Sequence, residues 1–374
     1  MDNQNFENDR PAFLSQFNNP NLSRIETLRG KLSSYRVDGI LFSNMNNIRY
    51  LTGFTGSEGF LVLSAKSALL LVDGRYTTQA ESEVQQISVI QYSNKIQGIQ
   101  QATSDLGLKI MGFEASFVTV EMYHDLTQKL KVAKLVPLGD ELRLLRACKD
   151  HQEIVLMKKA ATIGSAAITT LANKIKPGWT EREAALELEI LARRKGAEQL
   201  AFETIIASGE NAALPHAKPT NRKIRKGDFV VIDFGVKYQG YCSDETCTFA
   251  IGELTGDQNN AYRAVLKAHD EAIASIRAGI AVADVDAVVR KVLGKKYSRY
   301  FVHGTGHGVG IEVHEAPRLA PASQDVLAAG MVVTVEPGLY YPGLWGIRIE
   351  DTVLVKKKCC EIITKMNKKL IVIE

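Results

Sequence analysis

Short apolar runs alternate with helical patterns along the first 145 residues. "LSRIETLRGKLSSY" (22–35) has apolar residues at helical spacing, and Ser23 followed by Glu26 predicts a capping box at its start. The runs "DGILFS" (38–43) and "GFLVLSAKSALLLVDG" (59–74) are short and bounded by Gly and Asp, so they predict strands of a buried sheet. This part of the chain is therefore predicted to form a small α/β domain.

Longer helices and a second set of strands follow. A helix that begins near His151 is predicted to end before Pro177-Gly178, and Thr180 with Glu183 predicts a capping box for a helix that Gly196 ends. From residue 201 strand patterns dominate, interrupted by predicted helices at about 258–278 and 283–295. The charged segment "LRACKDHQE" (145–153) predicts a boundary near residue 148, which gives domains 1–148 and 149–374.

Composition excludes several classes of protein. Hydrophobic residues make up 45% of the chain and charged residues 24%, as in globular proteins, and no apolar run reaches membrane-spanning length. The start, "MDNQNFENDRPAFLSQF", is polar, so we expect a short leader and no signal peptide. The net charge of +4 comes with scattered lysines and does not favour nucleic acid. Five cysteines, an odd number, favour a reducing cytoplasm.

Two aspartates in a predicted hairpin are the first sign of a metal site. "GDFVVIDFGVKYQGYCSDETCTFAIG" (227–252) predicts paired strands, and a turn at Tyr238 and Gln239 would put Asp233 directly opposite Asp244. Like charges repel in that arrangement. A protein tolerates the pairing when a cation neutralises both carboxylates or when they share a proton.

Two glutamates and a histidine-rich stretch extend this set. Glu336 ends the apolar run "MVVTVEPG" (331–338), and alternation in "GIRIEDTVLV" (346–355) puts Arg348, Glu350 and Thr352 on one face. "HGTGHGVGIEVHE" (303–315) holds three of the seven histidines. Carboxylates with an imidazole suit Mn, Co, Fe or Zn, and a pair of such ions can support metal-assisted hydrolysis.

The order of these motifs resembles a known family. "DFG", "SDET", "HGTGHGVG", "VEPG" and "RIED" follow one another as in the pita-bread metallopeptidases, which include Xaa-Pro aminopeptidase (aminopeptidase P), prolidase and methionine aminopeptidase. The resemblance implies an α+β protein with a C-terminal pita-bread domain and a smaller creatinase/prolidase-like α/β domain before it. It also implies two divalent metal ions, manganese first and cobalt, zinc or iron as alternatives.

By the same resemblance, five residues are the metal ligands. Asp233 would bind one ion, Asp244 and Glu350 would bridge both, and His307 and Glu336 would complete the second site. Glu336 would also serve as the general base. The glycines around His307 would let the backbone approach the metal ions.

The resemblance also implies a set of substrate residues. His303 and His314 would line the pocket, and His216 in "ALPH" would stabilise the transition state; all three would act in catalysis. Arg318, in "HEAPRL", and Arg348 are further candidates for substrate binding, Arg318 as a clamp for a carboxylate or, equally, as a loop arginine paired with a surface acid. Cys247 stands where the family commonly has arginine, and His124, His151 and His269 are predicted to be surface or helix residues.

Two activities fit this resemblance, and the N-terminal part favours one. "NIRYLTGFTGSEGFLVLSAKSALLLVDGRYTTQAE" (47–81) is similar to aminopeptidase P and prolidase, and "GFTGSEG" with "DGRYTTQA" favours the former. We therefore predict an Xaa-Pro aminopeptidase that cleaves tripeptides and longer peptides with proline second, with prolidase as the alternative. A non-catalytic binding protein is a remote third, because all five ligands are present. A cytoplasmic homodimer without nucleic-acid or membrane partners is expected.

Overall fold

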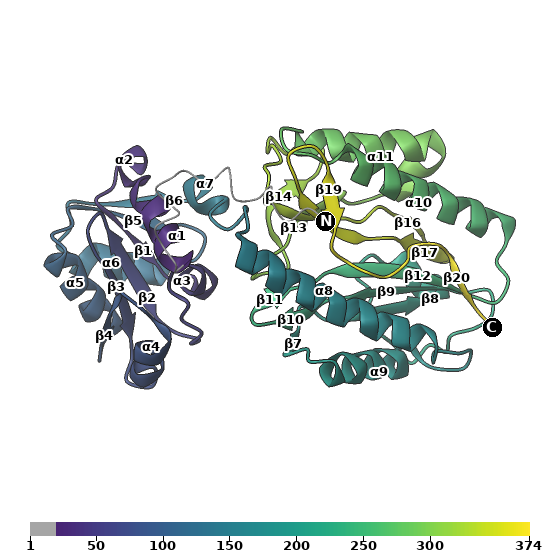
Figure 1. The fold of residues 1–374 in the computed structure, drawn as a ribbon, viewed down its shortest axis with the longest axis horizontal. Coiled ribbons are helices and arrows are strands. Elements are labelled where there is room, and N and C mark those ends of the chain that lie inside the picture. The colour runs from purple at the N-terminus through teal and green to yellow at the C-terminus, as the bar shows by residue number, and fades with distance from the viewer. Residues whose placement is uncertain (1–19) are drawn as a thin grey trace, which may run out of the picture. The chain divides into compact units, whose positions relative to one another are not determined.

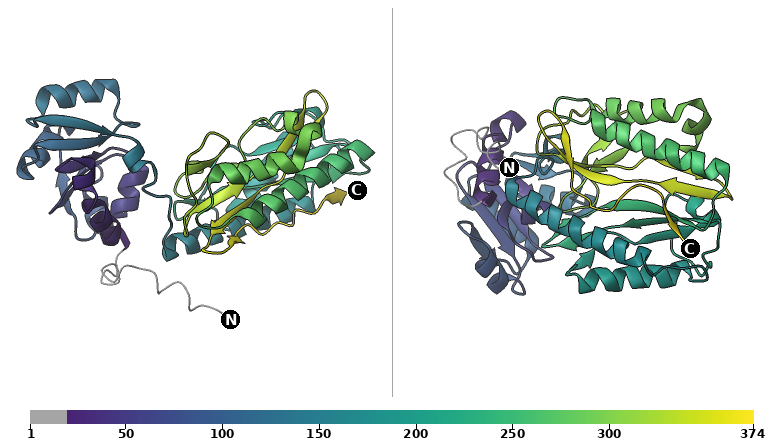
Figure 2. Two further views of the ribbon diagram at one scale, coloured as in Figure 1. Left: turned by 90° about the horizontal axis from the view of Figure 1, so that it is seen from above. Right: turned by 45° about the vertical axis from the view of Figure 1, so that its right-hand side comes forward.

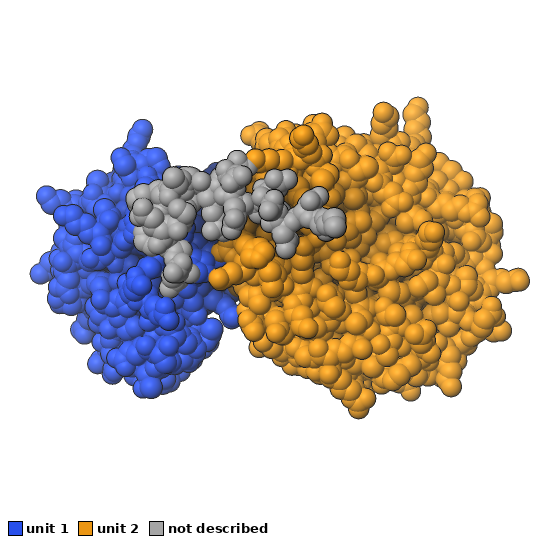
Figure 3. Space-filling model, in the orientation of Figure 1, with its two compact units in different colours: residues 1–145 blue, residues 146–374 orange. Residues whose placement is uncertain are grey.

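The chain consists of two compact units. The computed structural model describes residues 20–374, and the chain divides after Leu145 (Figure 3), just before the predicted boundary at residue 148. The predicted leader at the N-terminus lies outside the described residues.

The first unit is built on a six-stranded mixed sheet with the order β4-β3-β2-β1-β5-β6. Strand β1 pairs antiparallel with β2 and parallel with β5, and all residues of β1 and β2 are buried, which explains their continuous apolar sequence. The predicted strands in 38–43 and 59–74 are thereby confirmed. The strands are β1 (Gly39–Phe42), β2 (Phe60–Ser64), β3 (Ala68–Val72), β4 (Ser88–Gln91), β5 (Ile110–Glu114) and β6 (Lys134–Leu138).

Helices accompany this sheet, and one predicted helix is interrupted. The segment 22–35 forms two helices with a break at Gly30 and Lys31. The predicted capping box at Ser23 is wrong, because Ser23 lies inside the first helix and Glu26 pairs with Arg29 instead. The helices are α1 (Pro20–Arg29), α2 (Leu32–Tyr35), α3 (Met45–Thr52), α4 (Thr77–Glu83), α5 (Lys95–Asp105), α6 (Val120–Lys129) and α7 (Asp140–Arg143).

In the second unit, strands lie between two pairs of long helices. Figure 1 shows α8 and α9 on one side of the strands and α10 and α11 on the other, and Figure 2 shows α10 and α11 side by side. The capping box of Thr180 and Glu183 is confirmed, and α8 has a second one formed by Asp150 and Glu153. The helices are α8 (His151–Ala172), α9 (Glu181–Arg194), α10 (Gly256–Ser275), α11 (Val282–Tyr297), and the short helices η2 (Gly209–Ala213) and η3 (Ser298–Tyr300).

The strands of this unit form four sheets. Their orders are β11-β10-β7, β20-β12-β9-β8, β14-β13-β15-β18-β19 and β16-β17. The bounds are β7 (Gln199–Leu200), β8 (Ile205–Ser208), β9 (Phe229–Phe234), β10 (Val236–Tyr238), β11 (Tyr241–Cys242), β12 (Glu245–Ile251), β13 (Gly306–Gly308), β14 (Glu315–Leu319), β15 (Val332–Val335), β16 (Gly338–Tyr341), β17 (Trp345–Arg348), β18 (Asp351–Val355), β19 (Cys360–Ile362) and β20 (Ile371–Ile373).

Helix α8 is the one described helix that is long and apolar enough to cross a membrane by length and composition alone. In the fold it lies against strands of its own unit, and 56% of its most apolar window is buried there. Its apolar face shares a core with α9, β9 and β12. The composition of α8 is therefore accounted for by packing within the unit.

The predicted hairpin at 227–252 is present, but its register differs. Asp233 pairs with Thr246, not with Asp244, because the turn falls at Gln239 and Gly240. Both turn residues have positive φ, 46° and 79°, which is the backbone of a type I′ turn. The register shift of two residues keeps Asp233 and Asp244 on the same face, as diagonal neighbours.

Candidate metal centre

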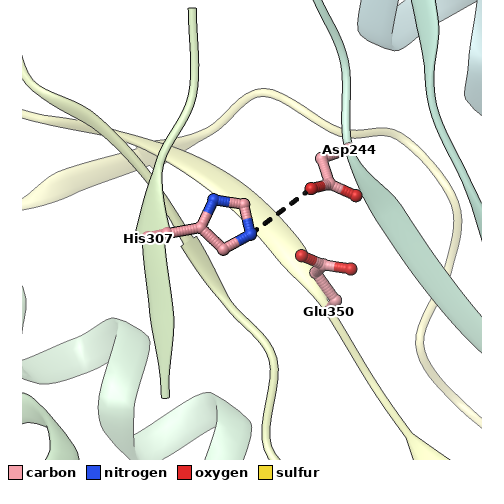
Figure 4. A group of neighbouring side chains, drawn as sticks. All are labelled: Asp244, His307 and Glu350. Atoms are coloured by element: carbon pink, nitrogen blue, oxygen red, sulfur yellow. Dashed lines mark ion pairs between the residues drawn. The ribbon is translucent and has the colours of Figure 1, made fainter. Parts of the chain in front are cut away.

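Three side chains converge at a buried point of the second unit. Ligand atoms of Asp244, His307 and Glu350 all lie within 4.8 Å of one another. Figure 4 shows the three side chains directed toward a common centre. The two carboxylate residues are only 4% and 2% exposed, so water screens their charges poorly. A divalent cation would neutralise this set, and its oxygen and nitrogen donors suit a first-row metal ion.

The protein fixes the orientation of the His307 ring. Its backbone N–H donates to Thr334 Oγ1 at 3.0 Å, and Nδ1 lies 3.0 Å from the carbonyl oxygen of Gly308. Nε2 consequently faces the acids, 3.6 Å from both Asp244 Oδ2 and Glu336 Oε1. A histidine that directs its other nitrogen to a carbonyl group is the usual arrangement in metal sites.

The glycines next to His307 serve strand packing. A Cβ on Gly306 would lie 2.0 Å from the Thr334 oxygen, and one on Gly308 would lie 2.3 Å from the Ala316 oxygen. The stretch thus forms a short strand, β13, pressed between β14 and β15. Strand packing therefore accounts for Gly306 and Gly308, and the expected approach of the backbone to the metal ions stays a prediction.

Asp233 lies slightly apart from the other ligand candidates. Its Oδ2 accepts a hydrogen bond from Arg348 at 2.6 Å, and its Oδ1 is buried without a hydrogen-bond partner. A buried carboxylate oxygen without a donor is costly unless a cation is near. Oδ1 of Asp233 therefore fits the role of a metal ligand, while Arg348 holds Oδ2 in place.

Arg348 does not fit the predicted role in substrate binding. The residue is 3% exposed, and its guanidinium group donates to Asp233, Thr246, Tyr340 and the backbone oxygen of Pro215. Protein acceptors occupy most of its donors, so a substrate would have to displace them. We therefore reassign Arg348 from substrate contact to the positioning of Asp233.

Burial shifts the acids of the centre toward their protonated forms. It raises the pKa of Glu336 to about 7. Burial also raises the pKa of Asp244, with the negative charge of Glu350 adding to the effect, and burial with the charge of Glu336 raises that of Glu350. Carboxylates that resist ionisation together are typical of a site designed around a positive charge.

The three candidate substrate histidines lie near this cluster. The ring of His314 packs edge-on against that of His307, with 4.3 Å between centroids. Nε2 of His303 lies 2.9 Å from the Tyr340 hydroxyl, and the charge of His216 would act on both His303 and His314. Burial lowers the pKa of His303 to about 4 and that of His314 below its usual value, so both are neutral near pH 7.

One residue near this site was missed by sequence reasoning. Glu181, fully buried at the start of α9, accepts hydrogen bonds from Ser208, Asn211 and Thr220, which close the segment that carries His216. Sequence reasoning read the helix start correctly at Thr180, but the partners of Glu181 are 27 to 39 positions away. Only the fold brings them together.

Arg318 is exposed. It lies on β14 directly opposite His307 of β13, and directly paired residues share a face of the sheet. No ion pair forms between Arg318 and any acid in the part of the chain that the structure describes. The interpretation of Arg318 as a loop arginine paired with a surface acid is therefore not supported.

Cys247 and His269 lie outside the cluster. Burial raises the pKa of the Cys247 thiol to about 12, which is unsuited to a thiolate ligand. His269, predicted to be a surface or helix residue, lies on helix α10 and is 2% exposed. Its ring lies between the carboxylates of Asp270 and Asp351.

Two family models match the chain. The model of metallopeptidase family M24 matches residues 155–357, and that of the creatinase/prolidase N-terminal domain matches residues 24–148. The matches together cover both units.

Relatives named as Xaa-Pro dipeptidases and relatives named as X-Pro aminopeptidases are both similar to this chain over nearly its full length. An Xaa-Pro dipeptidase of Pyrococcus horikoshii is 36% identical, over 90% of this chain and 95% of its own. The structure of an Xaa-Pro dipeptidase from Bacillus anthracis aligns with a TM-score of 0.92 at 39% identity, over 94% of this chain and 99% of that one. An X-Pro aminopeptidase from Thermotoga maritima aligns with a TM-score of 0.86 at 35% identity, over 93% and 99%.

Proposed function

Since the chain belongs to metallopeptidase family M24, we propose that it is a metal-dependent Xaa-Pro dipeptidase, which hydrolyses the bond between a residue and a C-terminal proline. The observation that carries this choice is Arg318, an exposed arginine paired across β13 and β14 with His307. A dipeptide has its free carboxylate beside the scissile bond, and arginine binds carboxylates in a bidentate pair.

Asp233, Asp244, His307, Glu336 and Glu350 would hold two divalent metal ions. Such ions, when bound, polarise a carbonyl group and lower the pKa of water. Manganese is proposed first, because the oxygen-rich donor set suits it, and cobalt, zinc and iron remain alternatives.

The remaining residues act on protons and on the substrate. Glu336 is proposed as the general base that accepts the proton of the attacking water, because its carboxylate lies among the proposed metal ligands, with Oε1 3.6 Å from His307 Nε2. His314, neutral near pH 7, would donate a hydrogen bond to the substrate carbonyl or to the tetrahedral intermediate. His303 would line the pocket, because its Nδ1 donates to the Gly304 carbonyl oxygen and its Nε2 accepts from the Tyr340 hydroxyl. His216 would assist from the segment that Glu181 anchors.

Substitution of Arg318 tests the dipeptidase assignment. The Arg318→Ala variant is expected to lose roughly 10- to 100-fold in kcat/KM on Xaa-Pro dipeptides, because a charge-assisted pair contributes about 1.5–3 kcal/mol. Tripeptides Xaa-Pro-Yaa lack a carboxylate at that place, so any activity on them is expected to change little. Arg318→Lys is the matched control, since it keeps the charge and loses the bidentate geometry.

The second candidate is the Xaa-Pro aminopeptidase that the N-terminal motifs favour, and the similarity to the Thermotoga maritima enzyme supports it. It makes the opposite prediction for substrate length. Faster cleavage of tripeptides than of dipeptides, with no effect of Arg318→Ala on either, would establish the aminopeptidase and remove the dipeptidase. A cytoplasmic homodimer remains proposed for either activity.

A further inference from the structure

A second cluster of charged side chains lies behind the metal centre. Glu245 and Asp351 directly follow the ligand candidates Asp244 and Glu350 in the sequence, and each begins a strand, β12 or β18. Successive side chains of a strand point to opposite faces, so these two acids are directed away from the metal ligands. They are 2% and 4% exposed.

One ammonium group joins the two acids. Nζ of Lys368 lies 2.5 Å from Glu245 Oε1 and 3.3 Å from Asp351 Oδ1, and the lysine is 8% exposed. Burial disfavours its charged form, but its neighbours Cys247, Glu245 and Asp351 outweigh this and raise the pKa of Lys368 above its usual range. Lys368 is therefore a buried cation shared by two carboxylates.

The remaining partners of the two acids are polar. Glu245 accepts from the Ser165 hydroxyl and from the backbone N–H of Met366, and Asp351 accepts from Thr364 at 2.5 Å and faces His269 at 3.2 Å. These contacts come from α8, α10 and the C-terminal segment. The cluster therefore joins several elements at one point behind the metal centre.

The position of this lysine matters because β12 and β18 belong to different sheets. On the metal side, Thr246 donates to Glu350 at 2.6 Å, and Thr352 donates to the Asp244 backbone oxygen at 2.6 Å. On the opposite side, the ammonium group of Lys368 is the ionic link between the two strands. Without the ammonium group, the buried carboxylates of Glu245 and Asp351 would repel each other. Each of these two residues directly follows a ligand candidate, Asp244 or Glu350.

We propose that Lys368 is a positioning residue of the metal centre, which fixes the separation of Asp244 and Glu350 by holding Glu245 and Asp351 together from behind. The proposal rests on the metal centre of the proposed function. Groups that orient metal ligands from behind typically contribute 10- to 100-fold in metal affinity. In the sequence, Lys368 is distant from the substrate histidines and from Arg318. It belongs to the C-terminal segment, which places its ammonium group next to Glu245 and Asp351.

Titration of the metal-free, full-length protein with MnCl₂ in a calorimeter tests this role. Lys368→Met is expected to weaken Mn²⁺ binding roughly 10- to 100-fold, and Lys368→Arg is expected to restore most of it. Circular dichroism establishes that each variant is folded at the titration temperature. If Lys368→Met does not fold, Lys368→Gln, which retains a hydrogen-bond donor without the charge, takes its place.

Tyr262→Phe is the matched control for this segment. The Tyr262 hydroxyl donates to the backbone oxygen of Lys368 at 2.8 Å, so its loss loosens the same segment and leaves the ammonium group intact. This variant is expected to melt at a lower temperature and to bind Mn²⁺ within about twofold of the wild type. The contrast separates a role in metal positioning from a purely structural one.

Two results would overturn the proposal. A folded Lys368→Met or Lys368→Gln variant that binds Mn²⁺ within about twofold of the wild type would do so, and so would equal weakening in Tyr262→Phe. Wild-type protein that binds none of Mn²⁺, Co²⁺, Zn²⁺ and Fe²⁺ would remove the proposed metal centre together with this role. Wild-type protein that binds Mn²⁺ but cleaves no peptide would remove only the proposed activity.

Discussion

At the scale of single residues, Glu336 has two proposed tasks that one substitution can separate. Its Oε1 lies 3.6 Å from His307 Nε2, within the cluster of ligand candidates, and burial raises its pKa to about 7. In Glu336→Gln the amide oxygen remains a donor to a metal ion, but the group no longer accepts a proton. Turnover is expected to fall about 100- to 10,000-fold while Mn²⁺ content, measured by atomic emission, stays near that of the wild type.

Two other results for Glu336→Gln would contradict the proposed roles of Glu336. Loss of metal along with activity would mean that both carboxylate oxygens are needed as ligands. Near-normal turnover in Glu336→Gln would assign the base to another residue. His314→Ala, which removes the ring packed against His307, gives the comparison for a residue that is not a proposed ligand.

At the scale of elements, the segment that carries His216 depends on Glu181. Both carboxylate oxygens of Glu181 accept N–H donors, from Ser208 and Asn211 on one oxygen and from Asn211 and Thr220 on the other. In Glu181→Gln the new NH₂ group therefore faces an N–H donor in either orientation. This mismatch costs about 1–3 kcal/mol and displaces the segment.

Glu181→Gln is accordingly expected to lower kcat/KM about tenfold, with Mn²⁺ affinity unchanged. If Glu181 acts through His216, the substitution adds little further loss in a His216→Ala background, and a double-mutant cycle measures this coupling. Full additivity of the two losses would contradict the positioning role. A loss of Mn²⁺ affinity would indicate instead that Glu181 supports the wider fold of the centre.

At the scale of the whole molecule, the buried acids couple metal binding to pH and stability. The pKa of Glu336 rises from 4.5 to about 7 in the metal-free fold. This group therefore favours folding most below about pH 4.5, and that contribution is lost as the pH rises through about 7. Metal ions require the deprotonated carboxylates, so binding releases protons below about pH 7 and tightens as the pH rises.

Melting temperatures with and without Mn²⁺ at about pH 5.5, 6.5 and 7.5 test this coupling. The increase caused by Mn²⁺ is expected to grow with pH, and Asp244→Ala is expected to show almost none at any pH. Calorimetry in buffers of different ionisation enthalpy counts the protons released. An increase in melting temperature that does not depend on pH would contradict protonation of the acids in the metal-free protein.

The sequence by itself determined most of the elements, the candidate metal ligands and the family. Periods of two and 3.6 residues are local properties, so the strands at 38–43 and 59–74 and the helices near 151, 181, 258 and 283 could be predicted from neighbouring residues. Acids embedded in apolar strands identified the metal-site candidates, because buried charge requires a partner. Alternation placed Arg348, Glu350 and Thr352 on one face, which the contacts of all three with β12 and its preceding residue confirm.

Only the tertiary structure decided which distant groups meet. The hairpin register depended on a turn at Gln239 and Gly240, where both residues have positive φ. A register shift of two residues leaves every side chain on the same face, so the alternation of apolar and polar residues does not reveal it. The partners of Glu181 and Arg348, and the link from Lys368 to Glu245 and Asp351, join positions from different elements and sheets. Local patterns carry no information about such pairs, because their free energy arises only when packing removes the charges from water.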